Sequence, residues 1–250
     1  SSLAKRLAVT GIAVAMSATT LVALPASADE TEANAQARTS VGAPGDVIAI
    51  AFQTNWNSVA KECTEAYGPE GVGYVQVSPP MESIQGTEWW TSYQPVSYRL
   101  DSKLGTEAEF KAMVEQCNAA GVGIIADVVL NQTTGSDVAA GEQTGVVGTR
   151  YNGTTGDYPG FTGESNRYPD GVTAADFHDY DNGANISDYK NQQEVQEGRL
   201  SSMWDFDTSS EKVRQIQSDY LTKLYNMGVQ GFRMDEVKHV NNEDMKAIKD

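Results

Sequence analysis

One nine-residue segment, GFRMDEVKH at 231–239, carries most of the side chains that could perform chemistry. An apolar run at 229–234 predicts a buried strand, and residues two apart on a strand share a face. Arg233 and Asp235 are therefore expected to point in the same direction at the end of this strand. A guanidinium keeps a neighbouring carboxylate ionised and orients it through charge-assisted hydrogen bonds. Such a carboxylate suits a nucleophile, although a structural ion pair is the alternative.

Further polar and aromatic groups follow two other runs that predict strands, at 72–77 and 123–130. Asp127 lies within the second run and Asn131 follows it. The loop after the first run contains three large aromatic residues: Trp89, Trp90 and Tyr93. In parallel α/β folds the chemistry gathers at the carboxyl ends of the strands. Aromatic faces beside polar groups are typical of ligand sites, although such a cluster can equally cover the end of a core.

Alternating strands and helices must position these groups. Apolar runs predict four strands, at 47–52, 72–77, 123–130 and 229–234. Apolar residues at helical spacing predict a helix after each of them. The expected helix starts are a cap at Asn57, capping boxes at Thr106–Glu109 and Thr208–Glu211, and a start near Asn242. This order implies a parallel sheet with right-handed crossovers.

The same order fits both an open, doubly wound sheet and a (β/α)8 barrel. No G-x-G-x-x-G motif opens the first helix, which weakens the case for a dinucleotide-binding oxidoreductase. The connection at 131–207 is too long for an ordinary loop and predicts a functional excursion or a small domain. Four strands make only half a barrel with two open edges, so we expect this sequence to be a fragment of a longer chain.

The composition restricts the possible partners. The chain has 250 residues, with 18 basic and 34 acidic side chains and a formal net charge of −16. Hydrophobic residues at 40% indicate a folded chain. An excess of acidic groups argues against binding to nucleic acid or to anionic membranes, because Lys and Arg must supply that affinity.

Residues 1–28 are predicted to be a secretory signal peptide. Lys5 and Arg6 precede a charge-free apolar stretch, and an A-x-A cleavage site ends at Ala28. Residues 29–45 are expected to form a flexible leader, and no other segment is long and apolar enough to span a membrane. The mature protein is therefore expected to be secreted. Export favours one disulfide between Cys63 and Cys117, and two buried free thiols are the alternative.

On these residues the chain resembles the α-amylases of glycoside hydrolase family 13, over roughly residues 45–250. The segments that carry the resemblance are GVGYVQVSPP, WWTSYQPVSY, DVVLNQ and GFRMDEVKH. The resemblance implies a (β/α)8 TIM-type barrel, cut short here after about four strands. Residues 46–130 and 208–250 would belong to the barrel, domain A, and residues 131–207 would be domain B, inserted after the third strand.

The resemblance also implies a role for each matching residue. Asp235 would be the catalytic nucleophile and Arg233 its charge partner. Seven residues would surround the bound sugar: Trp89, Trp90, Tyr93, Asp127, Gln132, Lys238 and His239. The family's structural calcium ion would be held by Asn131, Asp205, a backbone carbonyl near Gln196 and the carbonyl of His239. Oxygen ligands of these kinds suit Ca²⁺. The pair Cys63 and Cys117 matches a disulfide of the animal-like members.

The chain departs from the family pattern at two of these positions. Gln132 replaces the usual histidine, and an amide can hydrogen-bond a sugar hydroxyl but cannot carry charge. Gln196 stands where many relatives have arginine, which matters little if only its carbonyl is used. The family's general-acid glutamate and third aspartate belong to strands five and seven, which would follow Asp250. Chloride dependence is left open.

The predicted function is therefore that of a secreted, monomeric, calcium-dependent α-amylase that cleaves internal α-1,4 bonds of starch or maltooligosaccharides with retention. A transglycosylase or branch-cutting enzyme of the same family is one alternative. A secreted glucan-binding protein without turnover is another, because the residues of this sequence can bind sugar but lack the family's general acid.

Overall fold

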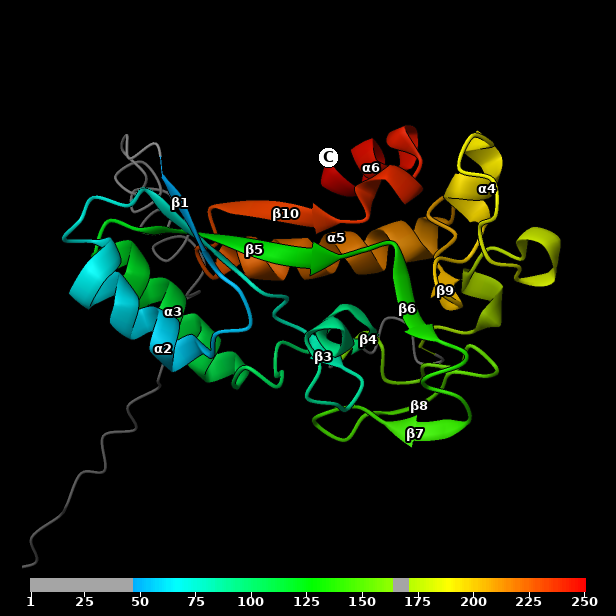
Figure 1. Ribbon diagram of the computed structural model, residues 1–250, viewed down its shortest axis with the longest axis horizontal. Helices are drawn as coiled ribbons and strands as arrows, with labels where there is room; N and C mark the ends of the chain where they lie inside the picture. The colour runs from blue at the N-terminus through cyan, green and yellow to red at the C-terminus, as the bar shows by residue number, and fades with distance from the viewer. Residues whose placement is uncertain (1–46, 164–170) are drawn as a thin grey trace, which may run out of the picture.

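The computed structural model describes residues 47–163 and 171–250 (Figure 1). The signal peptide and leader predicted at 1–28 and 29–45 lie outside the described residues. The central element is a parallel sheet in the order β1 (Ile48–Ala51), β2 (Tyr74–Val77), β5 (Gly123–Val129) and β10 (Gly231–Asp235). Each of the four predicted strands is present, and each pairs with the next one along the chain.

The order of the strands identifies how the sheet is wound. Because it never reverses, right-handed crossovers place the connecting helices on one face of the sheet. These helices are α2 (Trp56–Glu62), α3 (Glu107–Ala119) and α5 (Glu211–Asn226). A doubly wound sheet instead reverses its order and carries helices on both faces. The chain therefore forms a partial barrel-type sheet with β1 and β10 at its edges, and α6 (Asn242–Lys249) packs on α5.

Local hydrogen bonds fix the first turns of α2 and α3. The predicted capping box of α3 is confirmed: Thr106 Oγ1 accepts from the Glu109 N–H at 3.2 Å, and Glu109 Oε2 accepts from the Thr106 N–H at 2.8 Å. The predicted cap of α2 was wrong. Asn55, in extended backbone, accepts from the Ser58 N–H at 2.8 Å, whereas Asn57 lies within the helix. The Asn57 amide instead donates to Glu109, because α2 and α3 lie side by side.

The predicted capping box of α5 was also wrong. The helix begins after Ser210, and the Thr208 hydroxyl donates to Asp244 Oδ2 at 3.0 Å, a partner on α6. The helix is stabilised mainly by the apolar face that it buries. That face consists of Val213, Ile216, Tyr220, Leu221 and Leu224.

A disulfide joins the two helices α2 and α3, which lie side by side. Cys63 opens a short π-helical segment, η1 (Cys63–Tyr67), that continues α2, and Cys117 lies in the last turn of α3. The structure joins the two side chains, as predicted, and both are fully buried. The bridge therefore ties two neighbouring helices together at a sequence separation of 54 residues.

The double variant Cys63→Ser/Cys117→Ser is expected to lose about 4 kcal/mol of unfolding free energy, because the unfolded chain regains the entropy of an open loop. Urea denaturation of the oxidised wild type, the reduced wild type and the double variant measures the effect. Reduction should destabilise the wild type and leave the variant unchanged. Equal midpoints for the oxidised wild type and the variant would contradict the expectation.

Residues beyond the carboxyl ends of the strands form a second lobe, from β3, β4, β7 and β8 at the lower centre and right of Figure 1 up to α4 at its right edge. Its strands pair in antiparallel fashion: β3 (Glu82–Ser83) with β4 (Pro95–Ser97), β6 (Gln132–Gly135) with β9 (Met203–Asp205), and β7 (Glu142–Thr144) with β8 (Arg150–Asn152). The helix α4 (Gln192–Glu197) and short 3-10 turns complete it: η2 (Trp89–Tyr93), η3 (Ala174–Asp176), η4 (Tyr180–Asn182) and η5 (Val237–His239). Aromatic rings fill its interior, among them Tyr158, Phe161, Phe177 and Phe206.

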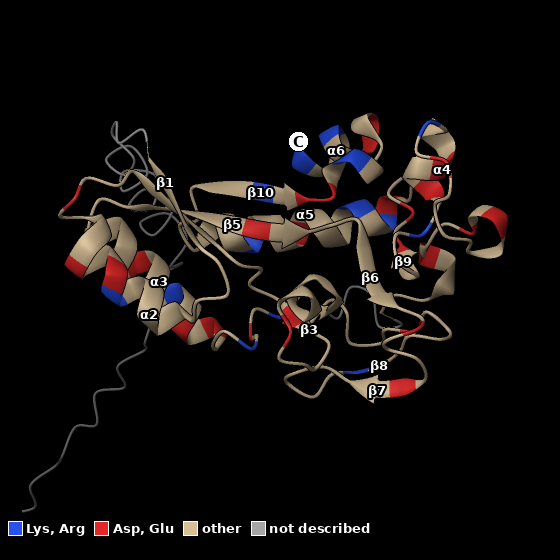
Figure 2. Cartoon of the chain, viewed as in Figure 1, with Lys and Arg blue, Asp and Glu red and all other residues tan. Residues whose placement is uncertain are grey.

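Acidic side chains are spread over the helices and the connecting segments of both lobes (Figure 2). Within 47–163 and 171–250, no helix combines the length and the apolar character that crossing a membrane requires.

Candidate functional site

Two strand ends bring three charged side chains into direct contact. In the parallel pairing of β10 with β5, Arg233 lies opposite Asp127. Arg233 Nη1 donates to both oxygens of Asp127, at 2.9 and 3.0 Å, and to Asp235 Oδ1 at 2.7 Å. Arg233 and Asp235 therefore do point in the same direction, as the two-residue period of a strand predicts. One guanidinium nitrogen holds two carboxylates.

Burial and charge act in opposite directions on these groups. Burial raises the pKa of Asp127 to about 6, although the hydrogen bonds from Arg233 and Tyr93 lower it. Burial likewise raises the pKa of Asp235, and the hydrogen bond and charge of Arg233 oppose this. Burial disfavours the charged form of Arg233, but Asp127 and Asp235 outweigh it and raise its pKa. Arg233 is therefore the group that keeps Asp235 available as an anion near neutral pH.

The aromatic residues lie on the short helix η2, beside these carboxylates. The Tyr93 hydroxyl donates to Asp127 Oδ2 at 2.8 Å. The Trp89 ring lies 6.0 Å from the ring of Tyr93 and 5.9 Å from that of Phe52. The side chains of Trp89 and Trp90 are 57% and 37% exposed, which is unusual for indole rings. The two rings are therefore not part of the core, and their exposed faces are available to a ligand.

A cleft of about 700 Å³ lies between the strand ends and the second lobe. Six of the predicted site residues line it: Trp89, Trp90, Tyr93, Gln132, Arg233 and Asp235. Eight further residues line it that were not predicted: Phe52, Gln94, Asp137, Val138, Leu200, Ser201, Met203 and Glu236. Phe52 follows β1, so its position at the carboxyl end of a strand was an available signal. The residues at 137–138 and 200–203 carry no such signal, because only the folding of the second lobe brings them here.

Gln132 lies between the aromatic residues and the nucleophile candidate. Its Nε2 donates to the backbone carbonyl of Tyr93 at 3.2 Å, and its side chain lowers the pKa of Asp235 slightly, against the larger effect of burial. Its Oε1 is buried without a hydrogen-bond partner. A buried acceptor of this kind is costly unless a ligand supplies a donor. The arrangement suits a sugar hydroxyl.

Lys238 and His239, on η5, are not among the residues that line this cleft, although His239 Nε2 lies 3.3 Å from Oε2 of the lining residue Glu236. The Lys238 ammonium lies 5.5 Å from the centroid of the Tyr189 ring. The His239 ring is buried, with Nδ1 2.7 Å from the Val195 carbonyl oxygen on α4. Their roles beside the sugar remain predictions.

Glu236, which follows Asp235, has left-handed backbone angles (φ 47°, ψ 30°). Few residues other than glycine adopt this conformation, and it turns the chain sharply after the strand. Asp235 is thus the last residue of β10 before the turn, and its side chain faces the cleft.

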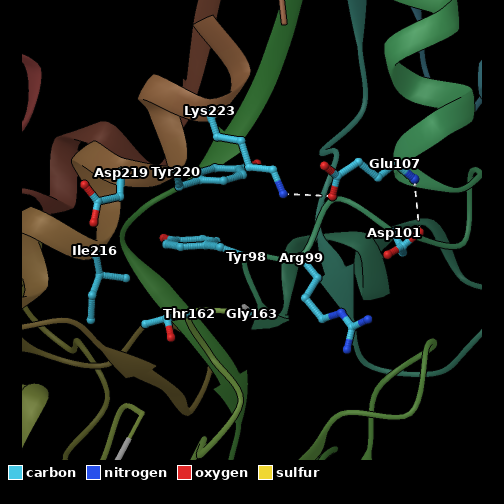
Figure 3. Close-up of a pocket in the computed structure, with 10 residues that line it drawn as sticks. All are labelled: Tyr98, Arg99, Asp101, Glu107, Thr162, Gly163, Ile216, Asp219, Tyr220 and Lys223. Atoms are coloured by element: carbon cyan, nitrogen blue, oxygen red, sulfur yellow. Dashed lines mark hydrogen bonds and ion pairs between the residues drawn. The ribbon is translucent and has the colours of Figure 1, made fainter. Parts of the chain in front are cut away.

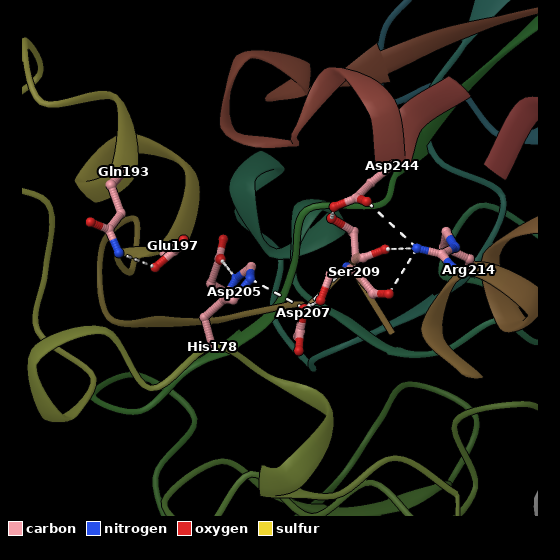
Figure 4. A network of polar contacts seen from close by, with 9 residues as sticks. His178, Gln193, Glu197, Asp205, Asp207, Ser209, Arg214 and Asp244 are labelled. Carbon is pink, nitrogen blue, oxygen red and sulfur yellow. Dashed lines mark hydrogen bonds and ion pairs between the residues drawn. The ribbon is translucent and has the colours of Figure 1, made fainter. Parts of the chain in front are cut away.

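The candidate calcium ligands lie where the second lobe joins β5. Asn131 and Asp205 are both buried, and the N–H of Phe206 donates to the Asn131 carbonyl at 2.9 Å. Asp205 Oδ2 lies 2.7 Å from His178 Nδ1, whereas Asp205 Oδ1 has no hydrogen-bond partner (Figure 4). The amide nitrogen of Asn131 is likewise buried and unpaired. The unpaired carboxylate oxygen of Asp205 is of the kind that a hard cation accepts, whereas the Asn131 amide nitrogen is a hydrogen-bond donor and cannot bind a cation.

Helix α4 brings the remaining candidate ligands to the same region. Gln196 lies between Val195 and Glu197 on this helix. The Val195 carbonyl contacts the His239 ring. The charge of Glu197 raises the pKa of Asp205, in addition to the larger effect of burial. Within the described residues no three His, Cys, Asp or Glu side chains are arranged to hold a metal. A site here would instead combine one carboxylate with amide and backbone oxygens, which a hard cation such as Ca²⁺ accepts.

A second hollow, of about 280 Å³, lies beside α5 and has a different character (Figure 3). Two of its tyrosine rings, Tyr98 and Tyr220, stack at 4.2 Å and are almost fully buried. Its charged residues Lys223 and Glu107 pair with each other at 2.8 Å. These contacts join α5 to its neighbours, so we assign this hollow a structural role.

Comparison with known proteins agrees with the geometry of the cleft. The profile of the family described as "Alpha amylase, catalytic domain" matches residues 71–249. The chain is 42% identical to an α-amylase of Streptomyces violaceus over 216 residues, which is 86% of this chain and 35% of the relative. It is 38% identical to an α-amylase of Pecten maximus over 209 residues, 82% of this chain and 40% of the relative.

A solved structure, wild-type α-amylase I of Eisenia fetida, superposes with a TM-score of 0.73 at 36% identity. The superposition covers 80% of this chain and 39% of that one. The chain thus spans between about a third and two fifths of the length of these relatives.

Proposed function

Because the chain belongs to the α-amylase catalytic-domain family, we propose that the complete protein hydrolyses internal α-1,4 bonds of starch-type glucans with retention of configuration. The observation that carries the proposal is Asp235, held by Arg233 at one wall of a cleft lined by exposed indole rings. A mutant of the Eisenia fetida enzyme is known as a complex with maltohexaose, and an extended cleft of this kind suits such a substrate.

Six residues at or beside the cleft have parts in this proposed reaction. Asp235 attacks the anomeric carbon while the glycosidic bond breaks and the general acid protonates the departing sugar oxygen. Water, deprotonated by the same acid/base residue, then hydrolyses the glycosyl-enzyme and frees Asp235. Arg233 keeps Asp235 ionised, and Tyr93 lies beside the sugar ring, held in place by its hydrogen bond to the buried Asp127. Trp89 and Trp90 supply apolar faces to neighbouring glucose units. Retention requires a second carboxyl group about 5–5.5 Å away, as general acid, and the family resemblance assigns it to a later strand.

Incubation of the complete protein with a reduced maltooligosaccharide tests the proposal. Internal cleavage with retention predicts products that are initially α-anomers, which proton NMR detects before they mutarotate. Release of β-anomers would contradict retention. Transfer of glucose units to longer products would favour the transglycosylase, and binding without products would favour the non-hydrolytic glucan-binding protein.

Secretion as a monomer and a structural calcium ion are part of the same proposal. Asn131, Asp205, the carbonyl near Gln196 and the carbonyl of His239 would hold the ion. When bound, it would supply positive charge that neutralises Asp205 and links β6, β9 and α4. The unpaired oxygen of Asp205 supports this assignment.

Removal of calcium is expected to destabilise the complete protein. A ligand that binds only the native state adds about 2.7 kcal/mol at a hundredfold excess over its dissociation constant. Melting temperatures with calcium and with chelator should therefore differ by several degrees. Asp205→Ala should abolish the difference, and Asp157→Ala, an exposed carboxylate in the same excursion, should preserve it. Identical melts of the wild type under both conditions would reject the calcium site.

A further inference from the structure

Lys103 contacts the helix that carries the exposed indole rings, although it lies outside the cleft. Its ammonium donates to the backbone carbonyl of Glu88 at 3.0 Å and to the hydroxyl of Thr91. Glu88 is the residue immediately before η2, and Thr91 is at its centre. One ammonium group therefore contacts the residue just before Trp89 and the residue just after Trp90.

These contacts complete a small, partly buried network at the start of η2. The Thr91 hydroxyl also donates to the Glu88 carbonyl at 2.6 Å, and the Thr91 side chain is buried. A side chain on Gly86 would collide with the Thr91 methyl group at 2.7 Å, so the chain passes closely beneath it. Burial lowers the pKa of Lys103, while the charge of Glu88 opposes the shift. Lys103 is thus partly enclosed by the network that it completes.

The backbone that presents Lys103 is itself held at both ends. Ser102 and Gly105 exchange two backbone hydrogen bonds, at 2.9 and 3.3 Å, which close a tight turn around Lys103. The carbonyl of Leu104 accepts from the Trp56 N–H at 3.0 Å, at the start of α2. Thr106, the cap of α3, follows immediately. Lys103 therefore extends from a fixed anchor between two helices, unlike most surface lysines.

The other half of η2 is held by different partners. The Tyr93 hydroxyl contacts Asp127, the Tyr93 carbonyl contacts Gln132, and the Ser92 hydroxyl donates to Gln53 Oε1 at 3.0 Å. Loss of Lys103 would thus loosen the segment with Trp89 and Trp90 and leave Tyr93 in place beside the carboxylates. Loosening the half with Trp89 and Trp90 should therefore weaken substrate binding, and the half with Tyr93 should still support the chemical step.

The geometry points to Lys103 as a positioning residue that holds the indole rings of Trp89 and Trp90 in the orientation that binds the glucan chain. This inference rests on the proposed function, since it assigns the ligand of the two rings. It adds a residue that touches neither the substrate nor Asp235.

The test compares the complete wild-type protein with Lys103→Met, Lys103→Arg and a control, Lys61→Met, an exposed lysine on α2. Lys103→Met should raise the KM for a long maltooligosaccharide about tenfold and leave kcat within about threefold, because only binding remote from the bond is weakened. Lys103→Arg, which retains the charge and several donors, should recover most of the KM. Lys61→Met should match the wild type.

Indole N–H signals in a ¹⁵N-correlated NMR spectrum give a readout that does not depend on activity. In Lys103→Met the signals of Trp89 and Trp90 should shift or broaden, while those of Trp56 and Trp204 stay in place and show that the fold persists. Single Trp→Phe variants assign the signals. Unchanged Trp89 and Trp90 signals, or an unchanged KM in an active enzyme, would overturn the assignment of Lys103. A wild type that neither binds nor cleaves the oligosaccharide would instead overturn the proposed function, with the indole result still deciding whether Lys103 holds the rings.

Discussion

Replacement of Asp235 by asparagine is expected to lower turnover of the complete protein by at least about three orders of magnitude. An amide cannot form the glycosyl bond, and no neighbouring water replaces the nucleophile at an equal rate. The amide oxygen can still accept the hydrogen bond that Arg233 Nη1 donates at 2.7 Å. The melting temperature and the affinity for oligosaccharide should therefore change little.

Asp137→Asn is the matched control, because Asp137 lines the same cleft without a bond to Arg233. Its turnover should remain close to that of the wild type. The alternative, a structural ion pair, predicts that Asp235→Asn lowers the melting temperature and spares the activity of each folded molecule. Turnover of Asp235→Asn within about tenfold of the wild type would show that Asp235 is not the nucleophile.

Replacement of Arg233 by glutamine is expected to move the acid limb of the kcat/KM profile to higher pH. Burial raises the pKa of Asp235, and Arg233 opposes that shift. Loss of the guanidinium therefore raises the pKa further, by about 1 to 3 pH units. A nucleophile must be ionised, so at a given acidic pH the variant has fewer active molecules than the wild type.

Stability should respond to pH in the same variant. Arg233 also lowers the pKa of the buried Asp127, which is already raised to about 6. A carboxyl group whose pKa is higher in the folded state favours folding only while it is protonated. Arg233→Gln should therefore lose stability relative to the wild type as pH rises from about 4, the ordinary pKa of the unfolded state. Arg233→Lys, which retains a charge, should lie between the two. An acid limb that coincides with that of the wild type would contradict this role.

The sequence predicted the strands and the charged contacts at their ends because both depend on short-range patterns. Arg233 and Asp235 are two residues apart on one strand, so the period of the strand alone predicts that they face the same way. Trp89, Trp90 and Tyr93 lie in the loop that follows the run at 72–77, and the structure places them on one short helix. These features needed only the local chain and the rule that parallel strands present their ends together.

Features that depend on long-range contacts were not predictable in this way. Thr106 and Thr208 begin the same motif, yet only Thr106 caps a helix, because Asp244 of α6 accepts the hydroxyl of Thr208. Leu200 and Met203 line the cleft only because β9 pairs with β6, some seventy residues earlier in the chain. No local pattern marks that pairing.

The left-handed turn at Glu236 has a consequence for engineering this protein. A glycine there would adopt the turn without steric strain and would stabilise the fold if the strain were relieved fully. The same freedom would loosen the backbone at the end of β10. The side chain of Asp235, the preceding residue, would then no longer be held in one orientation toward the cleft. The strained residue lowers the free energy of unfolding but keeps the active site rigid. A search for thermostable variants that selects glycine at position 236 would therefore select variants with lower activity.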